Sequence, residues 1–332
     1  MCQFLFLISC CTCNHRQKPL CIPVMGFGYN DDPLDFVPRL LRSVDFCVDH
    51  LIVVAPQRME GRVKEMINSL NLPANINVEP HFFPWRFVGV AETWNYIIRA
   101  SPDAPWFLIC AYDVQFLPMQ LEMLSQRFWK RSGNLSPGDN VTANIAHTRW
   151  LNMPGGKGFN LFALSREVVG NVGLFDENIY PAFWEDRDYL YRVKLWSGAR
   201  IRTFGDIRPI HGLFTDDKGV PLGMDVIRCL SAQIGKKFKS DCGVDAISSN
   251  KYISGTRHVK EKALKNLISV GDKRNFEYVI RKWGCDKSTS KRFYDLKNCT
   301  YITPFNSGNL ISYWIQNETE SSLLHRVDSF YK

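Results

Sequence analysis

The feature of this sequence that most constrains its fold is an alternation of strand and helix patterns between residues 20 and 111. Two continuous apolar runs, at 51–55 and 106–111, are short and lack a polar face, which is typical of strands buried on both faces of a parallel sheet. Apolar residues at three- and four-residue spacing predict helices at 36–44 and 90–100. Because strands alternate with helices, the sequence predicts an α/β fold in which a mostly parallel sheet is flanked by helices.

The alternation continues to about residue 215 and then changes to helical patches separated by polar stretches. The elements expected in this part are a strand at 159–164, a helix capped by Ser165, a helix that begins at Glu185, a strand at 201–204 and helical patches near 224–234 and 259–268. The domain boundaries follow from this change of pattern. They are an apolar, cysteine-rich tail over 1–20, a main domain over 21–215 with halves 21–125 and 126–215, and a basic, mainly helical C-terminal extension over 216–332.

The distribution of charge narrows the classes of partner. The chain of 332 residues carries a net charge of +8, with 41 Lys and Arg against 33 Asp and Glu. Residues 1–215 hold 21 Lys and Arg against 20 Asp and Glu, whereas residues 216–332 hold 20 against 13. The positive excess therefore predicts a C-terminal surface for an anionic membrane, a partner protein or a charged acceptor. No basic stripe interleaved with aromatic residues is visible, so we expect no nucleic-acid partner.

The cysteines and the N-terminal tail leave the compartment unknown. No run of 18 apolar residues is present, so we expect no complete transmembrane helix, and the apolar stretch 1–13 lacks the Lys or Arg of a signal peptide. Five of the eleven Cys fall in the first 21 residues, where a zinc site, acylation beside a membrane and an incidental tail all stay open. Other Cys, such as Cys47 and Cys110, are expected to be small buried apolar residues. Cytosolic or membrane-peripheral and ER or Golgi locations both stay open; N-x-S/T sequons occur at Asn134, Asn140, Asn298 and Asn317.

Several common nucleotide and metal motifs are missing from the sequence. It has no G-x-G-x-x-G, no Walker loop and no H-E-x-x-H, so dinucleotide, P-loop and zincin functions lack their fingerprints. Ligands of parallel sheets bind beyond the carboxyl ends of the strands. This rule selects three segments, which are 26–32, 55–58 and 112–113.

Acidic residues form the most informative candidate site. Asp113 directly follows a buried strand, where a metal or a phosphate partner would lie. Three further carboxylates, Glu185, Asp186 and Asp188, stand at the predicted start of a helix, where the helix dipole relieves part of their repulsion. Asp188 is expected to pair with Arg192 one helical turn later, whereas Glu185 and Asp186 lie at the tip and can face a cleft, where a carboxylate can act as a general base.

His211 is a candidate partner for Asp113. It follows the strand expected at 201–204 within the segment Arg208-Pro209-Ile210-His211-Gly212. A single His is more often a structural residue, but oxygen and imidazole ligands together suit Mn²⁺ or Mg²⁺ with phosphate oxygens. The pairing therefore depends on whether the fold brings His211 to Asp113.

Taken in order, several segments resemble family 2-type inverting glycosyltransferases, which have the GT-A fold. Gly89-Val90-Ala91-Glu92-Thr93-Trp94-Asn95 resembles a helix motif of that family. Trp106 to Val114 resembles its strand with a D-x-D-type metal motif, and Trp184-Glu185-Asp186-Arg187-Asp188 resembles its E-D-x-D motif. Further similar segments are 42–54, 158–164 and 173–178, with Arg281-Lys282-Trp283-Gly284 and Thr303-Pro304-Phe305-Asn306 resembling tail elements of one branch.

The resemblance implies transfer of a sugar, with inversion, from a nucleotide-diphosphate donor to an acceptor hydroxyl on a glycan, a lipid or a protein. Residues 21–125 would form the nucleotide-sugar half and 126–215 the acceptor half. Asp186 would be the general base, Glu185 would orient the acceptor, and Asp113 with His211 would hold Mn²⁺ or Mg²⁺ against the diphosphate. Donor contacts are assigned to Gly26, Gln57, Trp94, Asn95 and Asp113.

Two departures from the family pattern keep an alternative open. Acidic or amide residues usually precede the final Asp of the metal motif, but Ala111 and Tyr112 stand there in this chain. The second strand usually ends in an acidic or amide residue, where Ala55-Pro56-Gln57 stands here, so Gln57 is the substitute. The alternative is a degenerate relative that binds nucleotide or glycan without turnover. A nucleotidyltransferase would need a glycine-rich phosphate loop after the first strand. Gly26-Phe27-Gly28, with two glycines, is only a weak match to such a loop.

Overall fold

The protein is described here from a computed structural model. It describes residues 21–30, 35–73, 76–84, 87–132, 143–148, 159–195, 199–204, 207, 209–214, 252–253, 262–288, 296 and 298–300. The tail at 1–20, the helical patch near 224–234, the sequons other than that of Asn298 and the segment 303–306 lie outside these residues.

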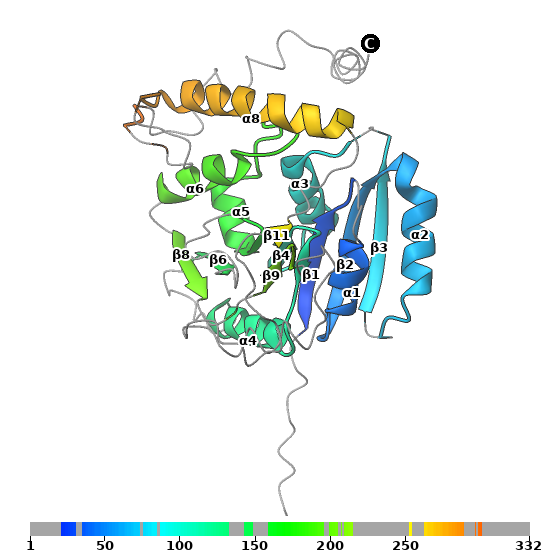
Figure 1. Cartoon of the computed structure of the whole chain (residues 1–332). Coiled ribbons are helices and arrows are strands. Elements are labelled where there is room, and N and C mark those ends of the chain that lie inside the picture. Colours follow the sequence, from blue (N-terminus) through cyan, green and yellow to red (C-terminus); the bar gives the residue numbers. More distant parts are fainter. Residues whose placement is uncertain are drawn as a thin grey trace, which may run out of the picture.

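A seven-stranded sheet with the order β3-β2-β1-β4-β7-β6-β8 forms the centre of the molecule (Figure 1). Its strands are β1 (Ile22–Gly28), β2 (Val48–Pro56), β3 (Ile76–Phe83), β4 (Trp106–Cys110), β6 (Ala143–Thr148), β7 (Leu161–Ser165) and β8 (Ala199–Phe204). The first four run parallel, and β7 is antiparallel to both β4 and β6. The expectation of an α/β fold with a mostly parallel sheet is confirmed. β6 was not expected from the sequence, and the antiparallel direction of β7 was not indicated by the alternation.

Two short two-stranded sheets lie outside the central one. β5 (Val114–Gln115) pairs with β9 (Ile210–His211), and β10 (Leu213–Phe214) pairs with β11 (Tyr252–Ile253). The first of these pairings matters for the site, because it joins the segment after β4 to a segment almost 100 residues later.

Helices cover both faces of the sheet. They are α1 (Phe36–Arg42), α2 (Glu60–Ser69), α3 (Val90–Ala100), α4 (Gln120–Ser132), α5 (Arg166–Val172), α6 (Glu185–Leu195) and α8 (Lys262–Trp283), with a short 3-10 turn η1 (Gln57–Met59). α3 has the bounds expected from its spacing, α6 begins at Glu185 as expected, and the Ser165 hydroxyl caps α5 by accepting from the Val168 backbone N–H at 3.3 Å. α8 continues to residue 283, well beyond the predicted patch.

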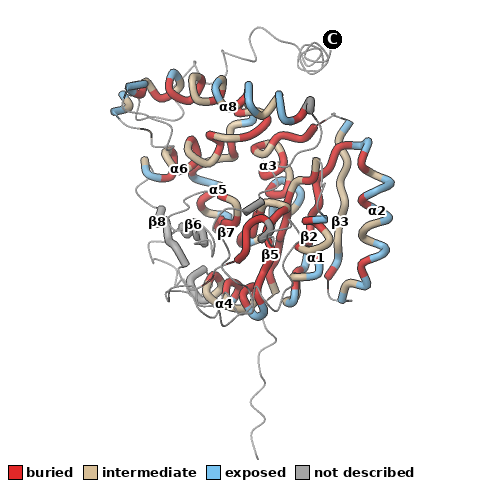
Figure 2. Tube along the Cα trace, viewed as in Figure 1, coloured by how far each residue is buried: buried red, intermediate tan, exposed pale blue. Residues whose placement is uncertain are grey.

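The alternation of side chains along each strand divides the core into two layers. In β2, Leu51, Val53 and Ala55 belong to one cluster, and Ile52 and Val54 belong to the other. The first cluster includes side chains of α1, α2 and α4, and the second includes side chains of α3, α5 and α6. The central strands are accordingly buried along most of their length (Figure 2), as the continuous apolar runs predicted.

α8 is packed onto the domain that the sequence placed before residue 215. Figure 1 shows it lying across one end of the molecule, over α3 and α6. Tyr278, Val279 and Trp283 of α8 form a buried cluster with Ile179 and Trp184. This helix of the C-terminal extension therefore shares a hydrophobic core with the segment that leads into α6.

One expectation about the cysteines is wrong. Cys47 is only half-buried and forms a disulfide with Cys21, and Cys285 forms a second disulfide with Cys299. The parallel register of β1 and β2 pairs Ile22 with Val48, so the two residues that precede them lie side by side, with Cα atoms 4.9 Å apart. Such a pairing across strands is invisible in the sequence. Cys110 is a buried free thiol, as expected.

We find, among the described residues, no helix that combines the length and the apolar character needed to cross a membrane. The basic surface expected for residues 216–332 stays a prediction, because most of that segment lies outside the described residues.

Candidate active site

The structure brings Asp113 and His211 together at the end of β4. β5 begins directly after Asp113 and pairs antiparallel with β9, so that Val114 lies opposite His211. The Gly212 backbone N–H donates to the Asp113 carbonyl at 2.7 Å, and His211 Nε2 lies 3.2 Å from Asp113 Oδ1. Both side chains are buried, with exposed fractions of 4% for Asp113 and 10% for His211. A carboxylate and an imidazole are thus held in contact at the carboxyl edge of the parallel strands.

Ala111 and Tyr112, which stand where the family pattern has acidic or amide residues, pack against the core. The Tyr112 ring meets Phe36 edge-on, with ring centroids 6.0 Å apart. The Ala111 backbone N–H donates to the Asn160 carbonyl at 2.6 Å, which joins this turn to the segment before β7. Both side chains therefore contribute apolar packing and supply no metal ligand. No group of three or more potential metal ligands is present within the described part of the chain.

Glu185 and Asp186 open α6 and are largely enclosed by protein. The exposed fraction of the Asp186 side chain is 14%, and its Oδ2 lies 3.6 Å from Arg187 Nε. The Asp186 carboxylate also accepts a hydrogen bond from the Phe159 backbone, two residues before β7 begins. Because β7 pairs with β4 through Leu161 and Cys110, Phe159 belongs to the same sheet edge as Asp113. The fold therefore brings the two acidic candidates to one edge from different elements.

Burial changes the proton affinity of both carboxyls. Burial raises the pKa of Asp186, and the Arg187 charge and backbone hydrogen bonds only partly oppose this. The pKa of Glu185 rises well above its usual value because it is buried and because Asp186 and Asp272 add negative charge nearby. Glu185 Oε2 has no hydrogen-bond partner within the part of the chain that the structure describes. A pair of carboxyls with raised pKa values in a partly enclosed site is typical of acid–base chemistry.

The turn before α6 has an unusual backbone. Phe183 and Trp184 have φ values of 72° and 79°, a region that side-chain-bearing residues rarely occupy. Such conformations cost about 1–3 kcal/mol each and persist only where surrounding contacts hold them. The two carboxyls are therefore presented by a strained turn that the surrounding structure must stabilise.

Two residues assigned to donor binding, Gly26 and Gln57, have different surroundings. Gly26 lies inside β1, and a Cβ atom there would approach Ile97 of α3 to 2.7 Å, so this glycine allows the helix to pack closely on the strand. Gln57 lies in η1 directly after β2, is exposed and donates to Glu60. Of these two residues, only Gln57 presents an exposed side chain beyond the end of a strand.

Trp94 and Asn95 lie in the interior. The Trp94 ring contacts Phe162 and Phe175, with centroids 4.8 Å from each. The Asn95 side chain exchanges hydrogen bonds with the Phe175 backbone, donating to its carbonyl at 2.9 Å and accepting from its N–H at 2.8 Å, and it also donates to Glu177 at 2.7 Å. These contacts fix the loop that follows α5, so the two residues support this loop from within the core.

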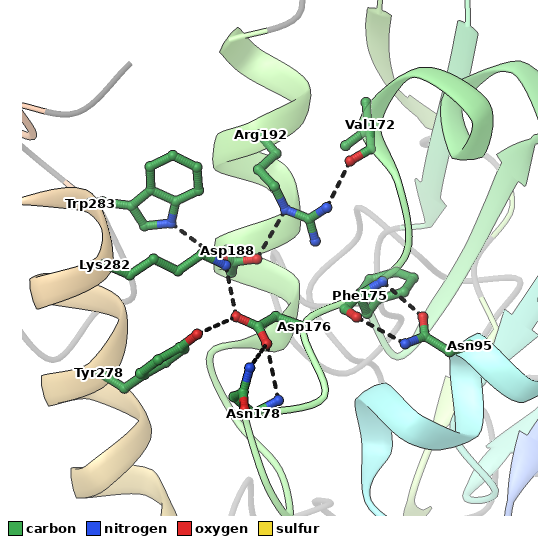
Figure 3. Close-up of polar contacts among 10 residues, drawn as sticks. All are labelled: Asn95, Val172, Phe175, Asp176, Asn178, Asp188, Arg192, Tyr278, Lys282 and Trp283. Atoms are coloured by element: carbon green, nitrogen blue, oxygen red, sulfur yellow. Dashed lines mark hydrogen bonds and ion pairs between the residues drawn. The ribbon is translucent and has the colours of Figure 1, made fainter. Parts of the chain in front are cut away.

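Asp188 lies on the side of α6 that faces α8, where it is the centre of a buried ionic network (Figure 3). The expected pair with Arg192 is confirmed, with Arg192 Nε donating to Asp188 Oδ2 at 3.1 Å. Asp188 Oδ1 also accepts from Trp283 Nε1 at 2.8 Å and lies 2.6 Å from Lys282 Nζ. Lys282 in turn lies 2.8 Å from Asp176 Oδ2.

Asp176 completes this network from the loop before α6. Its Oδ2 accepts from the Tyr278 hydroxyl at 2.7 Å, and its Oδ1 accepts from the Asn178 backbone and side chain. Burial raises the pKa of Asp176, but the charge of Lys282 and the hydrogen bonds from Lys282, Tyr278 and Asn178 outweigh burial and leave the pKa below its usual value. Lys282 and Trp283 belong to the segment Arg281-Lys282-Trp283-Gly284, to which the sequence pattern assigned no function.

Comparisons with known proteins do not establish a family for this chain. No protein-family profile matches the chain. A galactofuranosyl glycosyltransferase of Leishmania donovani is 59% identical over 32 residues, which is 10% of this chain and 7% of that protein. The chain is therefore matched to only a small part of that relative's length.

Solved structures with a similar arrangement have low identity. A mannosyltransferase from Pyrobaculum calidifontis, in complex with GDP-Man and Mn²⁺, aligns with a TM-score of 0.43 and 16% identity over 65% of this chain and 62% of its own. Glucosyl-3-phosphoglycerate synthase from Mycobacterium tuberculosis, in complex with phosphoglyceric acid, aligns with a TM-score of 0.35 and 15% identity over 68% of this chain and 81% of its own.

Proposed function

We propose that this chain is an inverting glycosyltransferase of the GT-A type, which transfers a sugar from a nucleotide-diphosphate donor to an acceptor hydroxyl. The observation that carries the proposal is the meeting of two acidic elements at one sheet edge. Asp113 with His211 lies after β4, and Glu185 with Asp186 lies at the start of α6, joined to the same edge through Phe159. The names of the similar proteins above point to the same class of reaction.

Inversion requires the base and the leaving diphosphate to stand on opposite sides of the sugar. In this proposal Asp186 removes the proton from the acceptor hydroxyl as that oxygen attacks the anomeric carbon, and the bond to the diphosphate breaks. Burial raises the pKa of Asp186, which makes its carboxylate a stronger base than an exposed one. Glu185, adjacent to it at the tip of α6, orients the acceptor.

The donor set of Asp113 and His211 fits a divalent cation. A carboxylate oxygen and an imidazole nitrogen are suitable for Mn²⁺ or Mg²⁺, with phosphate oxygens and water completing the coordination. When bound, the metal neutralises charge that develops on the leaving diphosphate. Asp113 would bind through its carboxylate, and His211 through Nε2, the atom that faces Asp113. Gln57 is the described side chain best placed for a further donor contact.

The packing of Ala111 and Tyr112 favours a second candidate, a relative that binds nucleotide or glycan without turnover. A site with two protein ligands holds metal less tightly than one with additional acidic side chains. The two candidates differ in turnover and in the effect of Mn²⁺ on donor binding, so one experiment separates them.

The experiment is a panel of nucleotide sugars with glycan, lipid and peptide acceptors, with and without Mn²⁺, in which release of the nucleoside diphosphate is measured. We expect release with one donor, dependence on Mn²⁺, and loss of at least about 10²-fold in kcat for Asp186→Asn, because a general base contributes about 10²–10⁴-fold. Asp188→Asn is not a suitable control, since it breaks the buried network. Asp103→Asn is suitable, because Asp103 is exposed and lies before β4, at the opposite end of that strand from Asp113. Tight donor binding without turnover and without an effect of Mn²⁺ would support the non-catalytic alternative, and full activity of Asp186→Asn would exclude Asp186 as the base.

A further inference from the structure

The turn that presents Glu185 and Asp186 is held by side chains from α8 that lie 88 to 93 residues later in the chain. Asn275 is buried, with 3% of its surface exposed, and its Nδ2 donates to the Ala182 carbonyl at 2.9 Å and to the Phe183 carbonyl at 3.2 Å. These are the carbonyls on either side of the first residue with positive φ. One side-chain amide therefore fixes two successive peptide groups of the strained turn.

Asp272, one helical turn before Asn275, holds the second strained residue. The Trp184 indole Nε1 donates to Asp272 Oδ1 at 2.9 Å, and the Trp184 ring packs on Phe276, with centroids 4.7 Å apart. Asp272, Asn275 and Phe276 lie at a spacing of three and four residues, which places them on one face of α8. That face contacts the turn immediately before the two acidic residues.

The close approach of α8 to this turn also depends on a glycine. A Cβ atom at Gly271 would lie 2.6 Å from Pro181 Cδ and 3.0 Å from the Tyr180 carbonyl, so no larger residue fits there without displacement. The Pro181 carbonyl accepts from the Val90 backbone N–H at 2.8 Å, which joins the turn to the start of α3. The strained turn is thus enclosed between α8 and α3.

From these contacts we infer that Asn275 and Asp272 are positioning residues, which act through the 182–184 turn to aim Glu185 and Asp186 at the acceptor. This inference rests on the proposed function. It extends that function by assigning a role in acceptor activation to α8, although neither residue touches the reacting atoms. Donor binding, which depends on residues at the ends of β1, β2 and β4, does not involve α8 and should not require these two side chains.

The two residues have separable effects. Asn275→Ala leaves two buried carbonyls without their donor and releases the turn. Asp272→Asn keeps an oxygen acceptor for the Trp184 indole but removes a negative charge from the surroundings of Glu185, whose other charged neighbours are Asp186 and Arg187 on α6. The first substitution tests geometry, and the second tests electrostatics with the geometry retained.

The test measures kcat, the KM for each substrate and the pH profile of the full-length protein and its variants. We expect Asn275→Ala to lower kcat by about 10²-fold, the loss that a misplacement of about 1 Å causes, with little change in the donor KM. Asp272→Asn should keep most of the activity and shift the alkaline limb of the pH profile to lower pH, because Glu185 acts in its protonated form and a nearby negative charge that raises its pKa is gone. Asp272→Ala should lose activity as Asn275→Ala does.

Two controls separate positioning from simple loss of stability. Lys273→Ala changes an exposed residue that lies between Asp272 and Asn275, and this variant should behave as the wild type. Tyr278→Phe removes the hydroxyl that α8 donates to Asp176 but keeps the ring that packs in the cluster with Trp184, so it should destabilise the fold while leaving kcat nearly unchanged. The inference would be overturned if kcat fell in proportion to the loss of stability in both Asn275→Ala and Tyr278→Phe. It would also be overturned if Asn275→Ala kept the kcat of the wild type.

Hydrogen exchange distinguishes failure of this inference from failure of the proposed function. In Asn275→Ala, amides of the first turn of α6 should exchange faster than in the wild type, whereas Lys273→Ala should leave them unchanged. If the wild type shows no turnover with any donor, the proposed function fails and positioning for catalysis fails with it. If turnover is present and exchange is unchanged in Asn275→Ala, the proposed function stands and the positioning role is wrong.

Discussion

Replacement of Lys282 by Met tests the ionic network that joins α8 to α6. Lys282 has 5% of its side chain exposed, and its Nζ lies 2.8 Å from Asp176 Oδ2 and 2.6 Å from Asp188 Oδ1 (Figure 3). The carboxylate of Asp188 has no exposed surface and that of Asp176 has 11%. Met keeps much of the length of the side chain and removes only the charge and its donors.

The magnitude follows from the charges that remain. In the wild type, Lys282 and Arg192 balance Asp176 and Asp188. After the replacement, two buried carboxylates share the single cation Arg192, which contacts Asp188. Removal of one partner from a buried ion pair costs about 3–5 kcal/mol, because an uncompensated charge is left away from water. We expect a loss of this size in the free energy of unfolding at pH 7.

The pH dependence has a definite sign. In the wild type the pKa of Asp176 is lowered, so its contribution to stability is present above the unfolded value of about 3.9 and is lost as the pH falls through the folded value. Without Lys282, the burial of Asp176 is no longer outweighed, and its pKa should rise above the unfolded value. The variant then gains stability on acidification, and the difference between the two proteins narrows between pH 7 and about pH 4.

Urea unfolding at several pH values measures both quantities, with Lys273→Met as an exposed control on the same helix. The control should lie within about 0.5 kcal/mol of the wild type. A cost below about 1 kcal/mol for Lys282→Met, or a difference that widens as the pH falls, would refute the view that Lys282 compensates two buried carboxylates.

Three further predictions concern stability and the pH profile. Cys21→Ser with Cys47→Ser should lower the free energy of unfolding by about 3–4 kcal/mol, because the disulfide closes a segment of 26 residues; thermal melts with and without reductant check this, and an unchanged melting temperature would contradict it. Gly26→Ala should cost about 1–3 kcal/mol, since the new Cβ would meet Ile97 at 2.7 Å, whereas Gly61→Ala, which meets nothing within 4 Å, should be neutral or stabilising. The acidic limb of kcat/KM should lie clearly above the usual carboxylate value of about 4, because burial raises the pKa of Asp186, which must be ionised to act as the base; a limb at or below 4 would argue against this role of Asp186.

The parts of the fold that were predictable from the sequence are those fixed by local pattern. The bounds of α3, the cap of α5 and the start of α6 follow from apolar spacing and from residues with local hydrogen-bonding roles. The direction of β7 was not predictable, because an apolar run records burial and not the orientation of the strand. The disulfide of Cys21 and Cys47 was missed for a related reason, since it depends on the register between two strands.

In the candidate site, too, some features were predictable from the sequence and others were not. The acidic residues of the site were selected by their places at a strand end and a helix start, and the contact of Asp113 with His211 was anticipated from the chemistry of a metal site. The environments of Trp94 and Asn95 could not be read from a motif, because a motif does not show whether a side chain faces a cleft or the core. Lys282, Tyr278 and Asn275 were missed because their partners lie about 90–105 residues away in the chain.

The three carboxyls at the start of α6 are compatible with one another because each has a different environment. Asp188 faces α8, where it contacts the cations Lys282 and Arg192. Asp186 has Arg187 and backbone donors, whereas Glu185 is buried beside the negative charges of Asp186 and Asp272, which the Arg187 charge only partly offsets. In a coupled pair with such unequal surroundings, Glu185 retains its proton to higher pH than Asp186. An ionised Asp186 beside a protonated Glu185 is the state in which one residue can accept the proton of an acceptor hydroxyl while the other donates a hydrogen bond to the acceptor.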